Sequence, residues 1–340
     1  MAIISPGHSF GAKFIQKVSP TQPQEGDVWF NPAFNTYKIY QSGEWVIFNN
    51  KKEAGIGSNY GYIFGGNSNG ISNVFRLQFP FNSGIATTIG YLAEGRRICQ
   101  GCNSYDYGYT VGGQNVSSIC RLQFPFNSGI ANHVGDITHN KYGAASFNSS
   151  QHGFFAGGYE TNAIGRFDFP FDTGNGYNVA TLPYSKPYVK GCNSSTYGYT
   201  CGPGGNWGAG YVHKLEFPFD SGSAVFCHNI ADSCDNYSCF NSSTYSYKTH
   251  GYPAHSSIER FQFSFDGSSA QIGTSIYSAN NACGCNSSVQ GFISVGGSSS
   301  NITRIDFPFD SGNDSLVGNL EINNDNHGAL DGTDFSSIFI

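Results

Sequence analysis

Apolar and polar side chains alternate along short segments of this chain, most clearly in residues 76–81 (RLQFPF). There the apolar side chains Leu77, Phe79 and Phe81 alternate with arginine, glutamine and proline. A period of two is that of a β-strand with one packed face. Because proline cannot donate a hydrogen bond within a sheet, Pro80 is expected to mark a strand end or an outer edge. The pattern predicts a strand over 76–81.

This segment belongs to a phrase, Phe-Pro-Phe-Asn/Asp-Ser-Gly, that returns six times at intervals of about 45 residues. Its copies begin at Phe79, Phe124, Phe169, Phe217, Phe263 (where serine replaces proline) and Phe307. An aromatic phrase ending in Gly-Gly precedes every copy except the fifth. A corner residue follows each copy, at Asn103, Asn148, Asn193, Asn241, Asn286 and Asp331. Repeats of about 40 to 50 residues with short strands and glycine turns are typical of a β-propeller, in which each repeat is one four-stranded blade. The chain is therefore predicted to be all-β, with a six-bladed propeller.

The repeats divide the chain into two predicted domains. The propeller covers 55–340, in repeats of about 57–103, 104–148, 149–193, 194–241, 242–286 and 287–340. Residues 1–54 lie outside the repeat, and their short alternating segments separated by turn residues predict a small N-terminal β-module with a linker. The last residues, 335–340, are apolar and are expected to complete the sixth blade.

Composition narrows the classes of function. The 340 residues include 45 glycines, 29 phenylalanines and 21 tyrosines, which suit many short strands and tight turns. A net charge of −6 without a basic cluster argues against nucleic acid as a partner, because phosphate binding needs grouped Lys and Arg. We find no apolar run long enough for a signal peptide or a membrane span, so we expect synthesis in a cytoplasm and no membrane insertion.

A basic residue stands three positions before each phrase, on the face of the predicted strand opposite the apolar residues. Inside a propeller, a blade is covered by its neighbours, so such a cation needs a carboxylate or carbonyl partner. The six cations could form a ring that binds an anion, or they could repeat one structural contact between blades. We favour the structural contact for Arg76, Arg121, Arg166, Lys214, Arg260 and Arg304.

The ten cysteines do not predict a metal site. Cys102, Cys192 and Cys285 occupy the repeat position that Phe147 and Phe240 fill in other units, which predicts small buried hydrophobes. The zinc-like spacing of residues 99 and 102 lacks a second pair. The Asn/Asp-Ser-Gly segments predict turns in preference to calcium loops, which gather more carboxylates. We expect no metal and no cofactor.

The sequence shows no catalytic constellation. Catalytic residues should break the repeat, whereas structural residues recur, and the acidic residues outside the repeat pattern share no convergent spacing. We expect a protein without catalytic residues, and a polysaccharide-degrading enzyme remains an alternative.

Two resemblances add a biological context. The spacing P-x-x-P-x-x-G-D-x-W-x-N followed by Y-x-x-G-x-W, which includes Trp29, Tyr40 and Trp45, resembles a small β-module of structural and adhesion proteins of tailed bacteriophages. The Gly-Gly phrases, the Arg-x-x-Phe-Pro-Phe-Asp-Ser-Gly phrases and the Asn-Ser-Ser corners resemble kelch-like propeller repeats in virion proteins of marine tailed phages, including phages of cyanobacteria. Unlike cellular kelch repeats, the units lack a regularly placed Trp, which disfavours an adaptor function of the ubiquitin-ligase kind.

These resemblances imply a virion protein, located on a tail fibre or the particle surface and made in the host cytoplasm. The N-terminal module would dock on other virion proteins through Trp29, Tyr40 and Trp45, and the propeller would bind a host-surface glycan or protein. Fibres are commonly trimeric, so a homotrimer is compatible with the resemblance, although the chain has no heptads for a coiled-coil stalk. A decoration protein of the capsid or tail, without a receptor, is the other alternative.

Receptor contacts are expected in loops where the units differ, just after the Gly-Gly phrases. An exposed Trp in an Asn/Gly-rich loop suits a sugar-binding platform, although Trp207 could equally pack over the propeller rim. The candidate receptor-binding residues are Gln114, Asn115, Tyr159, Glu160, Asn206, Trp207, Ser299 and Asn301.

Overall fold

The computed structural model describes residues 14–15, 19–25, 27–31, 36–41, 43–48, 59–138, 142–185, 188–203, 210–230, 236–263 and 268–332. The chain divides into two compact units, Met1–Lys52 and Glu53–Ile340. The segments 204–209 and 333–340 lie outside the described residues, and with them Asn206, Trp207 and the apolar C-terminal end.

The first unit is a small sheet of four strands. They follow the order β1 (Phe14–Ile15), β2 (Val28–Asn31), β3 (Thr36–Gln41) and β4 (Glu44–Phe48). Asp27, from the Gly-Asp pair of the motif, accepts a hydrogen bond from the backbone N–H of Gln24 through its carboxylate and one from Tyr40 through its carbonyl. Trp29 is buried, and its ring lies 5.5 Å from that of Trp45. The motif therefore builds a turn and an aromatic core.

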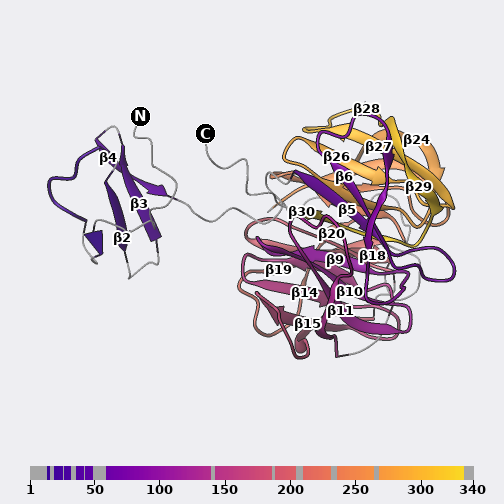
Figure 1. The fold of residues 1–340 in the computed structure, drawn as a ribbon, viewed down its shortest axis with the longest axis horizontal. Coiled ribbons are helices and arrows are strands. Elements are labelled where there is room, and N and C mark those ends of the chain that lie inside the picture. The colour runs from indigo at the N-terminus through magenta and orange to yellow at the C-terminus, as the bar shows by residue number, and fades with distance from the viewer. Residues whose placement is uncertain are drawn as a thin grey trace. The chain divides into compact units, whose positions relative to one another are not determined.

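The second unit is a ring of six small sheets, a six-bladed β-propeller, as the repeats predict (Figure 1). Blade 1 contains β30 (Gly328–Gly332), β5 (Tyr60–Phe64), β6 (Asn73–Gln78) and β8 (Thr88–Tyr91). Blade 2 contains β9 (Gln100–Asn103), β10 (Tyr107–Gly113), β11 (Val116–Gln123) and β12 (Asn132–Asp136). Blade 3 contains β13 (Ala145–Asn148), β14 (His152–Ala156), β15 (Ala163–Asp168) and β16 (Tyr177–Thr181).

Blade 4 contains β17 (Lys190–Asn193), β18 (Tyr197–Pro203), β19 (Gly210–Glu216) and β20 (Val225–Asn229). Blade 5 contains β21 (Ser238–Asn241), β22 (Tyr245–Thr249), β23 (His255–Gln262) and β24 (Ala270–Ala279). Blade 6 contains β25 (Cys283–Asn286), β26 (Gln290–Ser294), β27 (Ser299–Asp306) and β29 (Ser315–Asn324). Two short strands, β7 (Ile85–Ala86) and β28 (Gly312–Asn313), pair in parallel with β29 and β24 of the preceding blade.

The ring closes by joining the two ends of the propeller segment in one sheet. The first strand of each blade contacts the first strands of both neighbouring blades, and the circle is completed between β25, β30 and β9. In blade 1 this strand comes from the C-terminal end, because β30 pairs antiparallel with β5. Each sequence repeat therefore supplies three strands to one blade and its last strand to the next blade.

The repeated phrase folds as a link between blades. Strand β6 ends at Gln78, so the strand predicted over 76–81 is three residues too long, and Pro80 follows the strand end. The first phenylalanine of each phrase stacks on the aromatic residue of the preceding blade's second strand, with ring centroids 4.8–5.5 Å apart and planes within 24°. The six pairs are Tyr62–Phe124, Tyr109–Phe169, Phe154–Phe217, Tyr199–Phe263, Tyr247–Phe307 and Phe292–Phe79.

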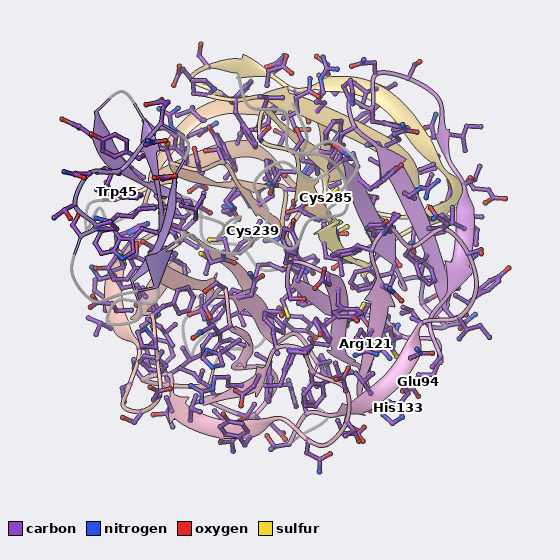
Figure 2. The ribbon with its side chains drawn as sticks, turned by 60° about the vertical axis from the view of Figure 1, so that its left-hand side comes forward. Trp45, Glu94, Arg121, His133, Cys239 and Cys285 are labelled. Carbon is purple, nitrogen blue, oxygen red and sulfur yellow. The ribbon has the colours of Figure 1, made fainter. Side chains whose placement is uncertain are left out.

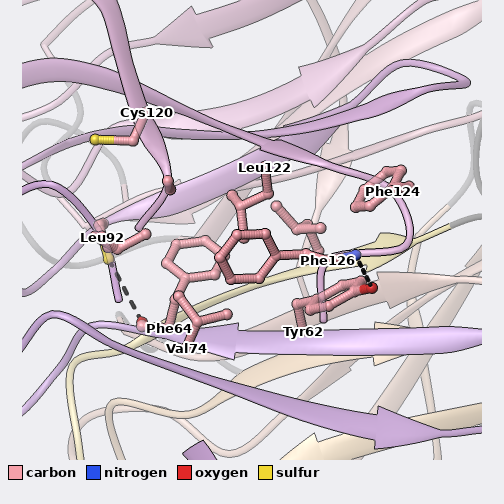
Figure 3. Close-up of a cluster of buried hydrophobic side chains, with 11 residues drawn as sticks. Tyr62, Phe64, Val74, Leu92, Cys120, Leu122, Phe124 and Phe126 are labelled. Carbon is pink, nitrogen blue, oxygen red and sulfur yellow. Dashed lines mark hydrogen bonds between the residues drawn. The ribbon is translucent and has the colours of Figure 1, made fainter. Parts of the chain in front are cut away.

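Figure 3 shows one such link, between blades 1 and 2. The ring of Tyr62 stacks on Phe124, and its hydroxyl oxygen accepts a hydrogen bond from the backbone N–H of Phe126 at 3.0 Å. The same bond joins Tyr109 to Phe171 and Tyr247 to Phe309. Because an aromatic pair contributes about 0.5–1.5 kcal/mol beyond its buried area, six stacks explain why the phrase recurs.

The alternating strands give the propeller two faces. The corners after the first strand and the Phe-Pro-Phe segments after the third strand lie at one end of each blade, which we call the FPF face. The Gly-Gly hairpins after the second strand and the connections to the next blade lie at the other end, which we call the Gly-Gly face. No helix long and apolar enough to cross a membrane occurs among the described residues.

Candidate functional site

The Gly-Gly face is shaped by backbone conformations that side chains rarely adopt. Both glycines of the doublet have positive φ in blade 2, +55° at Gly112 and +146° at Gly113, and a side chain at Gly113 would approach the connection from blade 1. In blade 5, where the sequence lacks the doublet, His250 and Gly251 adopt the same kind of turn with φ of +62° and +134°. The hairpin geometry is therefore kept although the doublet is not.

Four of the sequence-predicted receptor residues lie in two such turns of neighbouring blades. Gln114 is half-buried and Asn115 exposed at the hairpin tip between β10 and β11. Tyr159 and Glu160 are both exposed in the turn between β14 and β15.

Ser299 and Asn301 differ from these residues. The sequence places them in a loop, but they belong to β27 and are half-buried, because they pair with Asn324 and Asn319 of β29. They also lie in blade 6, across the ring from blade 3. The structure therefore does not bring them together with Tyr159.

Three tyrosines form a cluster on the Gly-Gly face of blade 3, which we call the tyrosine cluster: Tyr159 lies in the hairpin of this blade, Tyr142 in the connection from blade 2 and Tyr188 in the connection to blade 4. The rings of Tyr142 and Tyr159 are stacked, with centroids 5.0 Å apart and planes 13° apart, and Tyr188 lies 5.6 Å from Tyr142. The backbone N–H of Tyr159 donates to the carbonyl of Tyr142 at 3.0 Å. Tyr159 is 37% exposed, so the cluster presents an aromatic edge to solvent.

Backbone hydrogen bonds tie this cluster to the hairpin of blade 2. The N–H of Gln114 donates to the carbonyl of Arg97, and the N–H of Gly143 donates to the carbonyl of Ile98. Ile98 and Tyr188 have φ of +53° and +55°, which is unusual for such bulky residues. The residue at the same place, two positions before the first strand, also has positive φ in the other four blades, at Gly143, Asn236, Asn281 and Asn326, so this conformation is a repeated feature of the fold.

Tyr142 and Tyr188 were missed by the sequence interpretation. Both lie in connections between blades, and the sequence repeat does not show that these connections pack against the Gly-Gly hairpins. The one feature of the sequence that could have indicated them is that the connections before and after blade 3 each contain a tyrosine.

The cavity on the propeller axis is too small for a sugar. It measures about 60 Å³, far below the roughly 300 Å³ at which ligand pockets begin. The six corner side chains line it, and four of them, Asn148, Asn193, Asn286 and Asp331, accept a hydrogen bond from the backbone of the preceding blade, as in Asn148 Oδ1 from Asn103 N–H at 3.3 Å. Burial raises the pKa of Asp331, the only carboxylate at these six positions, to about 7.

The cations of the FPF face bind the turns of the next blade. The guanidinium of each described arginine donates to the Asn or Asp that follows the Phe-Pro-Phe phrase. The pairs are Arg76–Asn127, Arg121–Asp172, Arg166–Asp220, Arg260–Asp310 and Arg304–Asn82. Lys214 lies over the Tyr197 ring at 5.5 Å, and the turn residue at the corresponding repeat position, Asp266, lies outside the described residues. This arrangement is a structural contact between blades, and it leaves the five arginines engaged by turn side chains.

Cysteines also gather at one position. Cys102, Cys192 and Cys285 are buried, as predicted from their repeat position. However, the Sγ atoms of Cys192, Cys201 and Cys239 lie within 4.8 Å of one another, although the sequence predicts no metal-ligand set there.

Neither a scan against protein-family models nor a search of curated proteins found a match for this chain. The fold defines the class: the protein is a six-bladed β-propeller with an N-terminal β-module. Propellers of unrelated function use exposed loops to bind ligands, so the function has to be argued from the loops themselves.

Proposed function

We propose that this protein is a non-enzymatic virion surface protein, a tail fibre or particle-surface adhesin, whose propeller binds a host-surface glycan. The observation that carries the proposal is the tyrosine cluster. Aromatic rings with an exposed edge and a polar tip bind ligands that are apolar on one side and hydroxyl-rich on the other. Tyr159 offers such a ring on the face where the six units differ most.

The side chain of Gln114 supports a binding role for the same face. Its Oε1 atom is buried and has no hydrogen-bond partner. Buried polar atoms are nearly always paired, so an orphan acceptor beside a variable turn suggests a missing donor. Because this atom is buried, a sugar hydroxyl would supply that donor only after the Gln114 side chain turns towards the surface.

The N-terminal module would attach the propeller to the particle. Trp29 is buried within the module, whereas Tyr40 and Trp45 are half-buried and their rings lie 5.3 Å apart. We therefore assign the docking contact to Tyr40 and Trp45 and a structural role to Trp29.

The location is tested by electron microscopy of particles from the source lysate, labelled with antibodies against the full chain. We expect label at a tail, a fibre tip or the particle surface, together with neutralisation of infection. Capsid label with normal infection would favour the decoration protein, and unlabelled particles would overturn the virion assignment.

Glycan binding is tested with the purified full chain on polysaccharide extracted from the host. We expect Tyr159→Ala to weaken binding at least tenfold, because it removes the exposed ring of the cluster. Tyr91→Ala is the matched control, because Tyr91 is an exposed tyrosine on the outer strand of blade 1, 49% exposed against 37% for Tyr159. Equal binding by wild type and Tyr159→Ala would remove the cluster as the site, and release of reducing ends would favour the enzyme.

A further inference from the structure

Three thiols converge between blades 4 and 5, and they come from three different strands. Cys192 lies on β17, Cys201 on β18 and Cys239 on β21, with their Sγ atoms within 4.8 Å of one another. Cys192 and Cys201 are buried, and Cys239 is half-buried. Within the described part of the chain, this is the one group of three metal-ligand side chains at such distances.

The strand register explains why the thiols meet. Cys192 on β17 pairs with Tyr199 on β18, and Cys201 lies two residues after Tyr199 on β18. Both cysteines therefore project from the same face of blade 4. Cys239 lies on the first strand of blade 5, which contacts β17. In Figure 2 this residue is labelled near the centre of the ring.

The position of Cys239 departs from the repeat. The other blades carry only small residues there: Gly101, Ser146, Gly191, Gly284 and Ala329. A side chain is excluded at two of these positions, since a Cβ at Gly191 would lie 2.2 Å from the Ser146 carbonyl oxygen and one at Gly284 would lie 2.5 Å from the Phe240 ring. A thiol at this position is specific to blade 5.

A fourth donor departs from the repeat at the same place. Ser246 replaces a glycine that every other blade keeps: Gly61, Gly108, Gly153, Gly198 and Gly291. The Ser246 hydroxyl lies 3.1 Å from the Sγ of Cys192 and 3.5 Å from that of Cys239. Structural residues of a propeller recur, whereas this set of three thiols and one hydroxyl occurs once.

The donor set suits a thiophilic ion. Zn²⁺ is held by four ligands in a tetrahedron with thiolate sulfur at about 2.3 Å, which places the sulfurs about 3.8 Å apart. Separations of up to 4.8 Å can close to this distance by small side-chain rotations. Cys192 and Cys239 also line the axial cavity, which gives an ion a route from solvent.

The thiolate is the form of cysteine that binds a metal ion, so binding of Zn²⁺ would displace the thiol protons of the cluster. The Lys190 side chain is buried on β17, two residues before Cys192.

We propose that Cys192, Cys201 and Cys239 form a Zn²⁺ site, completed by the Ser246 hydroxyl or a water molecule, that links blade 4 to blade 5. This proposal is independent of the receptor proposal. It gives the bound ion a structural role, because the ligands come from two blades and the cavities that the described residues form beside them measure only about 60 and 10 Å³.

The test is a Zn²⁺ titration of the reduced, chelator-treated full chain against a chromophoric competitor, with Co²⁺ as a spectroscopic probe. We expect one ion per chain, thiolate-to-Co²⁺ charge-transfer absorption, and a melting temperature that rises with Zn²⁺ and falls with chelator. Cys239→Ala should weaken binding at least 100-fold and still fold, because alanine stands at this position in blade 1.

The matched control is Cys285→Ala, which removes a buried thiol from the repeat position of Cys192 in blade 6. It should bind Zn²⁺ as the wild type does. The proposal is overturned if the folded wild type binds no stoichiometric Zn²⁺, or if Cys239→Ala binds it equally well. The proposal is also overturned if Cys192 and Cys239 form a disulfide and the chain binds no metal after that disulfide is reduced.

Discussion

The two faces of the propeller are held together in different ways. On the FPF face, neighbouring blades are joined by the same aromatic stack and, at five described junctions, by the same arginine contact. On the Gly-Gly face a backbone hydrogen bond recurs in blades 1, 2 and 3, but the side-chain contacts are individual: buried Arg96 donates to carbonyls of Gly112 and Ser118 between blades 1 and 2, whereas Tyr142 stacks on Tyr159 further around the ring. Repeated chemistry closes the ring, which leaves the other face free to vary.

This comparison predicts a gradient of stability effects. Substitutions in the repeated links should lower the free energy of unfolding the most, and substitutions at the tips of the Gly-Gly hairpins should lower it the least. Four predictions, each with its substitutions, test this gradient.

The largest effect is expected for Phe154→Ala. Phe154 is fully buried and stacks on Phe147 and Phe217. Removing a buried phenyl ring leaves a cavity and costs about 3–5 kcal/mol of unfolding free energy. Urea unfolding measures the loss, and a cost below about 1 kcal/mol would contradict the role given to the stacks.

Phe154→Tyr is the matched variant. Four other blades carry tyrosine at this position, and in three of them its hydroxyl accepts a backbone N–H of the next blade. We therefore expect Phe154→Tyr to stay within about 1 kcal/mol of the wild type.

The second effect depends on pH. Asp331 stands where the other blades have Asn, and its carboxylate accepts the N–H of Asn286 at 2.6 Å. Its pKa is about 7 in the folded protein against 3.8 for a free carboxyl group. The folded state thus binds a proton more tightly, and this contribution to stability is present below pH 4 and is lost as the pH rises through 7.

Asp331→Asn removes this dependence and keeps the acceptor. The free energy of unfolding of the variant should equal that of the wild type near pH 4, become larger as the pH rises to about 7, and be about 1–3 kcal/mol larger at pH 8. The difference stays below the value that the whole pKa shift would give, because Asp331 is partly exposed to the cavity. Urea unfolding at pH 4, 6 and 8 checks this. Asn148→Asp, which places a carboxylate at the equivalent corner, should lose stability at pH 8, and a pH-independent difference would argue against a buried carboxylate.

A smaller effect is expected for Arg121→Ala. Arg121 pairs with Asp172 and lies over the Tyr107 ring at 4.4 Å, but Asp172 is mostly exposed. Exposed ion pairs contribute about 0–1 kcal/mol and are screened by salt. We expect the substitution to lower the free energy of unfolding by about 1 kcal/mol at low salt and by less in 1 M NaCl. An unchanged loss at high salt would assign the effect to packing on Tyr107.

The sequence predicts the fold because the repeated residues make the repeated contacts. The Phe-Pro-Phe phrase, its arginine and its turn recur with near-constant spacing, since each blade meets the next in the same way. The sequence does not predict the parts of the fold that depend on contacts between residues far apart in the chain or on backbone conformation without a glycine pair. Strand β30 enters blade 1 from the other end of the propeller segment, and His250–Gly251 keep a positive-φ turn without the Gly-Gly pair.

The candidate sites could be predicted only in part, for the same reason. Gln114 and Tyr159 follow doublets that are visible in the sequence. Tyr142 and Tyr188 lie in connections that become neighbours only in the closed ring. The spacing of Cys192, Cys201 and Cys239 resembles no metal motif, because two strands of blade 4 and the first strand of blade 5 set their proximity.

The smallest effect is expected at the hairpin tip of the Gly-Gly face. Asn115 is exposed with φ of +61°, a conformation that Asn tolerates and Gly adopts freely. Asn115→Gly should therefore change the unfolding free energy by less than about 0.5 kcal/mol, whereas Asn115→Val should cost about 1 kcal/mol, because a β-branched residue is strained there. If Asn115→Gly cost as much as Arg121→Ala, the hairpin tips would contribute to the ring as the FPF face does. In that case variation on the Gly-Gly face could not be explained by freedom from structural constraint.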